Sequence, residues 1–315
     1  MVSQAVPAKR TDPNLDQYRE AERALWEHYG LEPVERFVEI EEPQARLRMI
    51  EVGSGEPTVF IPGTPGTGPY WGALLRELRG VRALLIDRPG WGLSSPIDYS
   101  TYRYPHVVAQ VLAGLLDASG LDRVNLVGHS IGNVWALRLA AAHPERVKRV
   151  ALIGGGPVVS EIVAPKFIKL LASPLGAVMV RLPQKAGQIR ANLRQAGHAA
   201  TLDAGRVPDA FVEWRVAFHR LTSSMRHERQ MVRSLVGRGG WRPGLTFDDA
   251  ELAEIRPPVL WTYGTADPVG SAEVWQRAVD LLPNGELRLI EGAGHLPWLD
   301  DPQGVAAPLD QFLKG

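Results

Sequence analysis

The sequence has no cysteine among its 315 residues. The absence of thiols excludes a cysteine nucleophile, a disulfide bond and a thiolate metal site together. Covalent catalysis by this chain cannot use a thiolate, so serine, histidine and carboxylate side chains become the principal candidates.

The chain also lacks net charge and long apolar runs. Its 35 basic and 35 acidic side chains cancel, so no overall field attracts nucleic acid or an anionic membrane. The longest apolar stretch, around residues 167–182, contains Lys169 and falls short of the roughly 20 residues that span a bilayer. Residues 1–10 lack the pattern of a secretory signal. We therefore expect a cytoplasmic protein with no nucleic-acid partner and no stable membrane insertion.

The remaining composition is that of a globular protein, with 45% hydrophobic and 22% charged residues. An amphipathic helix is predicted between Asp12 and Gly30, because Asp12 can cap it, Pro13 suits its first turn and Gly30 its end. We interpret residues 1–34 as a helical extension that packs on its own domain or makes a dimer or lid contact.

Beyond residue 35, the pattern is typical of an α/β protein. Residues 36–41 and 46–52 alternate in polarity and predict an antiparallel strand pair. Short apolar runs then alternate with helical stretches, which predicts a doubly wound, mostly parallel sheet. The runs occupy residues 58–61, 83–86, 124–127, 150–153, 259–263 and 287–290.

One long interval breaks this alternation. Residues 157–250 contain no convincing strand, while residues 209–221 and 223–236 have helical patterns. An interval of about 95 residues is too long for a loop, so we predict a helical cap inserted into a core made of residues 35–156 and 251–315. The cap carries 14 Lys and Arg against 7 Asp and Glu, so its positive charge balances an acidic core.

The best candidate for a nucleophile is Ser130, in the sequence Gly-His-Ser-Ile-Gly at residues 128–132. The motif follows an apolar strand and precedes a helix, where a serine on a sharp turn is exposed and faces the positive end of the helix dipole. A glycine-rich turn in which Ser130 merely caps the helix is the structural alternative.

The chain resembles the capped α/β-hydrolases over about residues 35–315. Besides the Ser130 turn, three motifs occur in the order seen in that family: Asp-Arg-Pro-Gly-Trp-Gly-Leu-Ser at 87–94, Gly-Thr-Ala-Asp at 264–267 and Gly-Ala-Gly-His at 292–295. The resemblance implies an α/β-hydrolase fold and a serine hydrolase.

A serine hydroxyl needs a base, and the base needs a carboxylate to orient it. His295 and Asp267 each follow a predicted strand at the carboxyl edge of the sheet, where active sites of open α/β folds form. His129 is expected to point away from Ser130. The alternative place for the acid, after the strand ending at residue 153, holds three glycines. Asp300 and Asp301 are predicted to cap the last helix.

An oxyanion hole requires two backbone donors. By resemblance, one is the amide of Ile131, and the other comes from the loop at residues 62–68, where Thr64 is the natural donor. Many members of the family have His-Gly where this chain has Pro62-Gly63, so how this loop is anchored is open.

The sequence predicts hydrolysis of a small carboxylic ester or lactone through an acyl-enzyme. A C–C bond hydrolase, a proline-iminopeptidase-like enzyme and a slow-turnover ligand-binding protein remain alternatives. No metal or organic cofactor is implied, and a homodimer is possible. The basic cap can favour anionic substrates. Candidate substrate contacts are Trp91, Trp298, Trp214 and Phe218.

Overall fold

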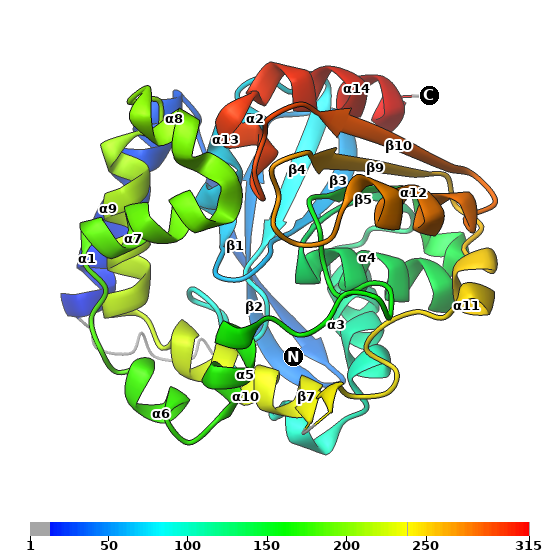
Figure 1. The fold of residues 1–315 in the computed structure, drawn as a ribbon, viewed down its shortest axis with the longest axis horizontal. Coiled ribbons are helices and arrows are strands. Elements are labelled where there is room, and N and C mark those ends of the chain that lie inside the picture. Colours follow the sequence, from blue (N-terminus) through cyan, green and yellow to red (C-terminus); the bar gives the residue numbers. More distant parts are fainter. Residues whose placement is uncertain (1–12, 238, 315) are drawn as a thin grey trace, which may run out of the picture.

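The computed structural model describes residues 13–237 and 239–314, whose core is a single eight-stranded sheet. The spatial order is β1-β2-β4-β3-β5-β6-β9-β10, with antiparallel pairing of β1 with β2 and of β2 with β4 and parallel pairing elsewhere (Figure 1). The strands are β1 (Val34–Glu41), β2 (Gln44–Val52), β3 (Glu56–Ile61), β4 (Val81–Ile86), β5 (Val124–His129), β6 (Val147–Ile153), β9 (Val259–Gly264) and β10 (Gly285–Ile290). The predicted fold class is confirmed.

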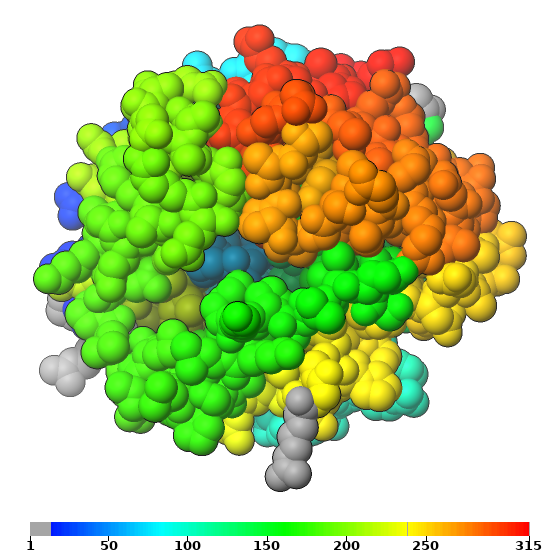
Figure 2. Space-filling view, in the orientation of Figure 1, coloured from blue at the N-terminus to red at the C-terminus, as the bar shows by residue number. Residues whose placement is uncertain are grey.

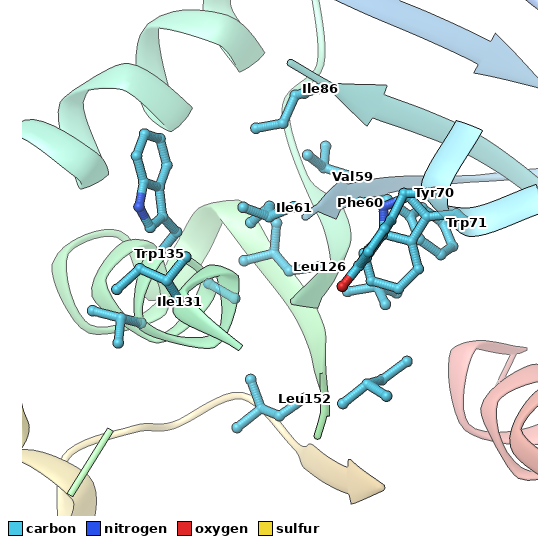
Figure 3. Close-up of a cluster of buried hydrophobic side chains, with 14 of the residues drawn as sticks. Val59, Phe60, Ile61, Tyr70, Trp71, Ile86, Leu126, Ile131, Trp135 and Leu152 are labelled. Carbon is cyan, nitrogen blue, oxygen red and sulfur yellow. The ribbon is translucent and has the colours of Figure 1, made fainter. Parts of the chain in front are cut away.

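Helices cover both faces of the sheet (Figure 1). Helices α3 (Tyr104–Ala118), α4 (Ile131–Ala142) and α12 (Ala272–Asp280) pack on one face, and α2 (Gly72–Leu75) and α14 (Pro302–Lys314) pack on the other. Figure 3 shows that neighbouring residues of β3 pack on opposite faces of the sheet. Phe60 points towards Tyr70 and Trp71, whereas Ile61 points towards Ile131 and Trp135. This alternation follows from the two-residue period of a strand.

Two sequence predictions differ from the structure. The apolar run at residues 287–290 predicts a strand buried on both faces, but β10 is the edge strand and Leu289 is 49% exposed. The sequence also predicts a helix near residues 71–78, after the loop at residues 62–68, but this helix starts as a 3₁₀ turn, Gly68–Trp71, and its α-helical part ends at Leu75.

The chain between β6 and β9 is mainly helical and lies over the carboxyl edge of the sheet (Figure 1). It contains α5 (Lys166–Ala172), α6 (Gly176–Met179), α7 (Ala186–Leu193), a π-helical turn (Arg194–His198), α8 (Ala199–Asp203), α9 (Asp209–Leu221), α10 (Ser224–Leu235) and α11 (Asp249–Ala253). Two short strands, β7 (Val236–Gly237) and β8 (Gly240–Trp241), pair there, although the sequence predicts no strand. We call residues 157–250 the cap.

Helix α1 (Pro13–Tyr29) joins the cap to the core. It packs on α9 and on α2, and Tyr18 contacts Phe218 of the cap at 6.5 Å between ring centroids. The helix ends at Gly30, whose φ of 66° is the left-handed conformation expected after a helix. Asp12, which is predicted to cap the amino terminus of this helix, lies outside the described residues.

A buried ionic cluster fixes α1 to the sheet. Arg48 of β2 donates to both carboxylate oxygens of Glu22, at 3.0 and 2.6 Å, and also contacts Glu35 and Asp87. Arg48, Glu22 and Asp87 are almost fully buried. Burial raises the pKa of Asp87 to about 6, and the nearby Arg48 cation opposes this rise.

Replacing Arg48 by Met should destabilise the fold strongly. The substitution leaves Glu22 and Asp87 buried without their cation, which typically costs about 3–5 kcal/mol in the free energy of unfolding. Arg36→Met is the control, because Arg36 is exposed and its pair with Glu51 is worth less than about 1 kcal/mol. Equal unfolding free energies for the two variants in urea titrations would show that the cluster contributes no special stability.

Candidate active site

Ser130 stands on a strained turn between β5 and α4. Its φ of 56° and ψ of −119° make it the only residue other than glycine with positive φ in the described parts of the chain. Such backbone geometry costs about 1–3 kcal/mol and persists only where the surroundings enforce it. It presents the side chain at the tip of the turn, as in a nucleophile elbow.

The glycine at position 132 is required by close packing of the elbow on β3. A Cβ atom there would lie 2.1 Å from the carbonyl oxygen of Ile61, which is less than any real contact. The motif glycine therefore lets α4 start directly against the end of β3.

His295 and Asp267 form a hydrogen-bonded pair at the same edge of the sheet. His295 Nδ1 lies 2.9 Å from Asp267 Oδ2, and the Asp267 side chain is fully buried. Since the carboxylate accepts the Nδ1 proton, the neutral ring has its lone pair on Nε2. Ser130 and His295 both lie in the described parts of the chain, and no hydrogen bond joins Ser130 Oγ to the His295 ring. Such bonds often tighten only when substrate binds.

Two backbone amides complete the environment of Asp267. Gly155 N donates to Oδ2 and Val269 N to Oδ1, each at 2.8 Å. A Cβ atom at Gly155 would lie 2.0 Å from the Val269 carbonyl oxygen, so only glycine fits. In the sequence, residues 154–156 stand out only because they offer no acid, whereas in the structure the amide of Gly155 donates to the acid.

His129 has both ring nitrogens occupied and points away from Ser130, as predicted. Its Nε2 must donate to the carbonyl oxygen of His295 at 2.7 Å, so its Nδ1 accepts from the Tyr70 hydroxyl at 2.6 Å. Burial, reinforced by the charge of His295, holds the pKa of His129 well below its usual value. His129 thus supports the His295 loop and offers no free base.

The amides proposed for the oxyanion hole are unused within the described structure, since neither Thr64 N nor Ile131 N donates a hydrogen bond there. The Thr64 loop is anchored by two arginines in place of the family's histidine. Arg88 Nη2 donates to Gly63 O at 3.1 Å, and Arg215 Nη1 of the cap donates to Pro65 O at 2.9 Å.

Glu228 of α10 reaches the same loop. The Thr64 hydroxyl donates to Glu228 Oε2 at 3.1 Å and accepts from Arg88 Nη2 at 3.2 Å. Burial raises the pKa of Glu228 to about 7, against the opposing charge of Arg88. Glu228 is therefore only partly ionised at neutral pH and offsets part of the Arg88 charge beside the loop.

Arg215 has no such compensation. It is 7% exposed, its Nε has no partner, and no carboxylate in the described residues forms an ion pair with it. Burial lowers its pKa to about 10, so the guanidinium stays charged at neutral pH. An uncompensated buried cation is costly, which marks this position as receptive to an anion.

The cap also holds the loop that carries His295. His295 N donates to Ala196 O at 2.8 Å, and Leu296 N donates to His198 Nε2 at 3.1 Å. His198 Nδ1 must then donate to Asp300 Oδ2 at 2.8 Å, and this oxygen also accepts from Gly294 N. The prediction that Asp300 caps the last helix is wrong because the buried His198 occupies it, whereas Asp301 does accept from Gly304 N in α14.

The four predicted substrate contacts are buried packing residues. Trp91, Trp214, Phe218 and Trp298 are each 0% exposed. Trp91 stacks under the Arg88 guanidinium, Trp298 stacks on Trp71, and the Trp214 ring contacts Phe218. None of the four therefore presents a surface to a ligand. Periodicity and loop position cannot separate a lining aromatic from a core aromatic.

Figure 2 shows a hollow on the face that carries the cap, between the light-green α7 region and the green chain leading to α5. Blue atoms from the early part of the chain lie at its floor. In the described parts of the chain, no group of three His, Asp or Glu side chains could hold a metal ion. The helices described there are all too short or too polar to span a bilayer.

The model of the alpha/beta hydrolase family matches residues 58–307. The chain belongs to this family. Its members' hydrolase chemistry agrees with the pair at His295 and the elbow at Ser130, so the prediction of an α/β-hydrolase enzyme is confirmed.

Several curated relatives are similar over most of their length. The chain is 28% identical over 271 residues to 2-hydroxy-6-oxononadienedioate/2-hydroxy-6-oxononatrienedioate hydrolase from Cupriavidus pinatubonensis, covering 82% of this chain and 88% of the relative. It is 30% identical to 2-hydroxy-6-oxononadienedioate/2-hydroxy-6-oxononatrienedioate hydrolase 2 from Pseudomonas putida, covering 82% of this chain and 89% of the relative. Among solved structures, a carboxylesterase from Bacillus subtilis aligns with a TM-score of 0.75 at 20% identity over 96% of this chain and 99% of its own, a likeness of fold alone.

His198→Ala should slow turnover of an aryl ester about 10-fold to 100-fold with KM changed only a few-fold. The change leaves Leu296 N unpaired and removes the His198 donor from Asp300, so the His295 loop is held less firmly in position. His198→Gln retains an acceptor and a donor and should restore most of the rate. His143→Ala is the control, because the side chain of His143 is 41% exposed. Unchanged kcat in His198→Ala and in Asp300→Asn would show that the contact does not position His295.

Proposed function

We propose that this protein hydrolyses a carbon–carbon bond next to a ketone in an anionic 2-hydroxy-6-oxo-dienoate. The observation that carries the proposal is the similarity to hydrolases named for such a substrate, over more than four fifths of this chain. The ester or lactone predicted from the sequence has weaker support, because the carboxylesterase likeness concerns the fold alone. The C–C hydrolase alternative is therefore the better supported one.

In the proposed reaction, Ser130, His295 and Asp267 act as nucleophile, base and orienting acid. A proton first moves from the hydroxyl on carbon 2 of the substrate to carbon 5. Ser130 Oγ then adds to the carbon 6 ketone while His295 Nε2 takes its proton, and the amides of Thr64 and Ile131 bind the resulting oxyanion. The bond between carbons 5 and 6 breaks.

The chemistry of the leaving fragment explains why this bond can break. Its electron pair passes through the remaining double bond to the carbon 2 carbonyl, giving a dienolate that takes the proton from His295. Water then attacks the acyl-Ser130 ester, with His295 again as base, and releases a carboxylic acid. The overall change is addition of one water and formation of a 2-hydroxydienoate and an acid.

Arg215 provides the electrostatic reason to favour an anionic substrate. Its charge is buried beside the Thr64 loop and lacks a carboxylate partner in the described structure. A substrate carboxylate would compensate it and would place the ketone near the Thr64 amide. The same cation disfavours the ammonium group of a proline-iminopeptidase substrate.

A substrate panel tests the proposed reaction. We expect kcat/KM for 2-hydroxy-6-oxononadienedioate to exceed that for p-nitrophenyl acetate by about 100-fold or more, as followed by loss of dienol absorbance. Ser130→Ala should lower the dienoate rate by about 1,000-fold or more. Preference for esters or lactones would contradict the proposal, and a single burst without turnover would indicate a ligand-binding protein.

Arg215→Met should raise KM for the dicarboxylate about 10-fold to 100-fold, because one charge-assisted contact is lost. The kcat/KM for neutral p-nitrophenyl acetate should stay within a few-fold. Arg220→Met, an exposed position on the same helix, is the matched control. An equal loss for charged and neutral substrates would show that Arg215 only holds the loop at Pro65.

A further inference from the structure

Exposed large apolar side chains are concentrated in one part of the cap. Of nine such residues in the described parts of the chain, seven lie between residues 163 and 182, and the other two are Val34 and Leu289. The seven are Val163, Phe167, Leu170, Leu175, Val178, Met179 and Leu182. Clustering of this kind on a protein surface usually marks a binding surface. We call residues 163–185 the α5–α6 surface.

These residues follow helical spacing but face outwards. Leu175, Val178, Met179 and Leu182 are spaced i, i+3, i+4 and i+7, the pattern that normally faces a core. Backbone hydrogen bonds continue the helical turn of α6 as far as Leu182. In α5, Ile168 and Leu171 face inwards and are buried, whereas Phe167 and Leu170 are 61% and 39% exposed. Two short helices thus each present an apolar stripe to the exterior.

The charges interspersed with these stripes have one sign. Residues 162–185 contain four basic side chains and no acidic one. All four are exposed, and none belongs to an ion pair in the part of the chain that the structure describes. They are Lys166, Lys169, Arg181 and Lys185.

The combination of apolar stripes and unpaired cations favours one occupant. A second copy of this chain, docked by two-fold symmetry, would bring the same cations together. A layer of anionic phospholipid would accept the apolar side chains at the acyl boundary and pair its phosphates with the cations. We propose that the α5–α6 surface docks the cap on an anionic phospholipid bilayer without spanning it.

The docked face lies one helix layer from the candidate active site. Helix α5 packs on α10, and Arg229 Nη2 of α10 donates to Ser173 O at 3.0 Å. The neighbouring Glu228 contacts Thr64. Figure 1 places α5 and α6 on the outside of the molecule, and Figure 2 shows their green atoms beside the hollow. Docking would therefore hold the hollow near the lipid surface, while the Ser130 chemistry stays independent of it.

Vesicle co-sedimentation of the full chain tests this proposal. The probes are vesicles of phosphatidylcholine alone and vesicles that also contain phosphatidylglycerol, each at low and high salt. We expect binding to the anionic vesicles that weakens with salt. Phe167→Ser combined with Leu175→Ser should lower the partition coefficient by about tenfold or more, and Lys169→Glu by about tenfold on anionic vesicles only.

Matched controls are Leu289→Ser, an exposed leucine of β10, and Arg220→Glu, an exposed cation of α9, which should both bind as wild type does. Hydrolysis of soluble substrate should be unchanged in every variant, which separates this proposal from the proposed reaction. Absence of binding to anionic vesicles, or binding insensitive to Phe167, Leu175 and Lys169, would overturn it. So would a dimer in sedimentation velocity that is lost in Phe167→Ser with no vesicle binding.

Discussion

The active site depends on the backbone of Ser130, which is held in a left-handed conformation that serine normally avoids. The surroundings enforce it from two directions. The start of α4 fits against the end of β3 only because position 132 is glycine, and Ser130 N donates to Ile153 O at the end of β6. The strain of the turn is thus borne by the most buried strands of the sheet, where relaxation would disturb a close-packed core.

The rest of the site is built around this turn by loops that fix one another. Gly155 supplies an amide to Asp267, Asp267 orients His295, and the carbonyl of His295 accepts from His129, the residue before Ser130. The cap closes the arrangement through Ala196 and His198. The cap is therefore part of the support of the base as well as a cover over the hollow.

The sequence was sufficient to predict the sheet, the mainly helical chain between β6 and β9 and the close approach of His295 and Asp267, because these depend on residue periodicity and on motifs at strand ends. It could not predict contacts that join distant segments. Asp300 and Asp301 look equivalent in sequence, yet only the fold brings His198 to Asp300. Trp91 and Trp298 follow strands and so resemble pocket residues, but cation stacking and aromatic stacking bury them completely. Likewise, only the fold shows that Arg88 and Arg215 anchor the Thr64 loop in place of the family's histidine.

The central claim is that the strained turn and the Asp267–His295 pair make Ser130 the reactive group. The most direct measurement is peptide mapping by mass spectrometry after brief treatment with a fluorophosphonate, which modifies an activated serine. We expect one adduct, on the peptide that contains Ser130, and labelling slowed by orders of magnitude in Asp267→Asn because the base loses its orientation. An adduct on another serine, or equal labelling rates in both proteins, would contradict the account.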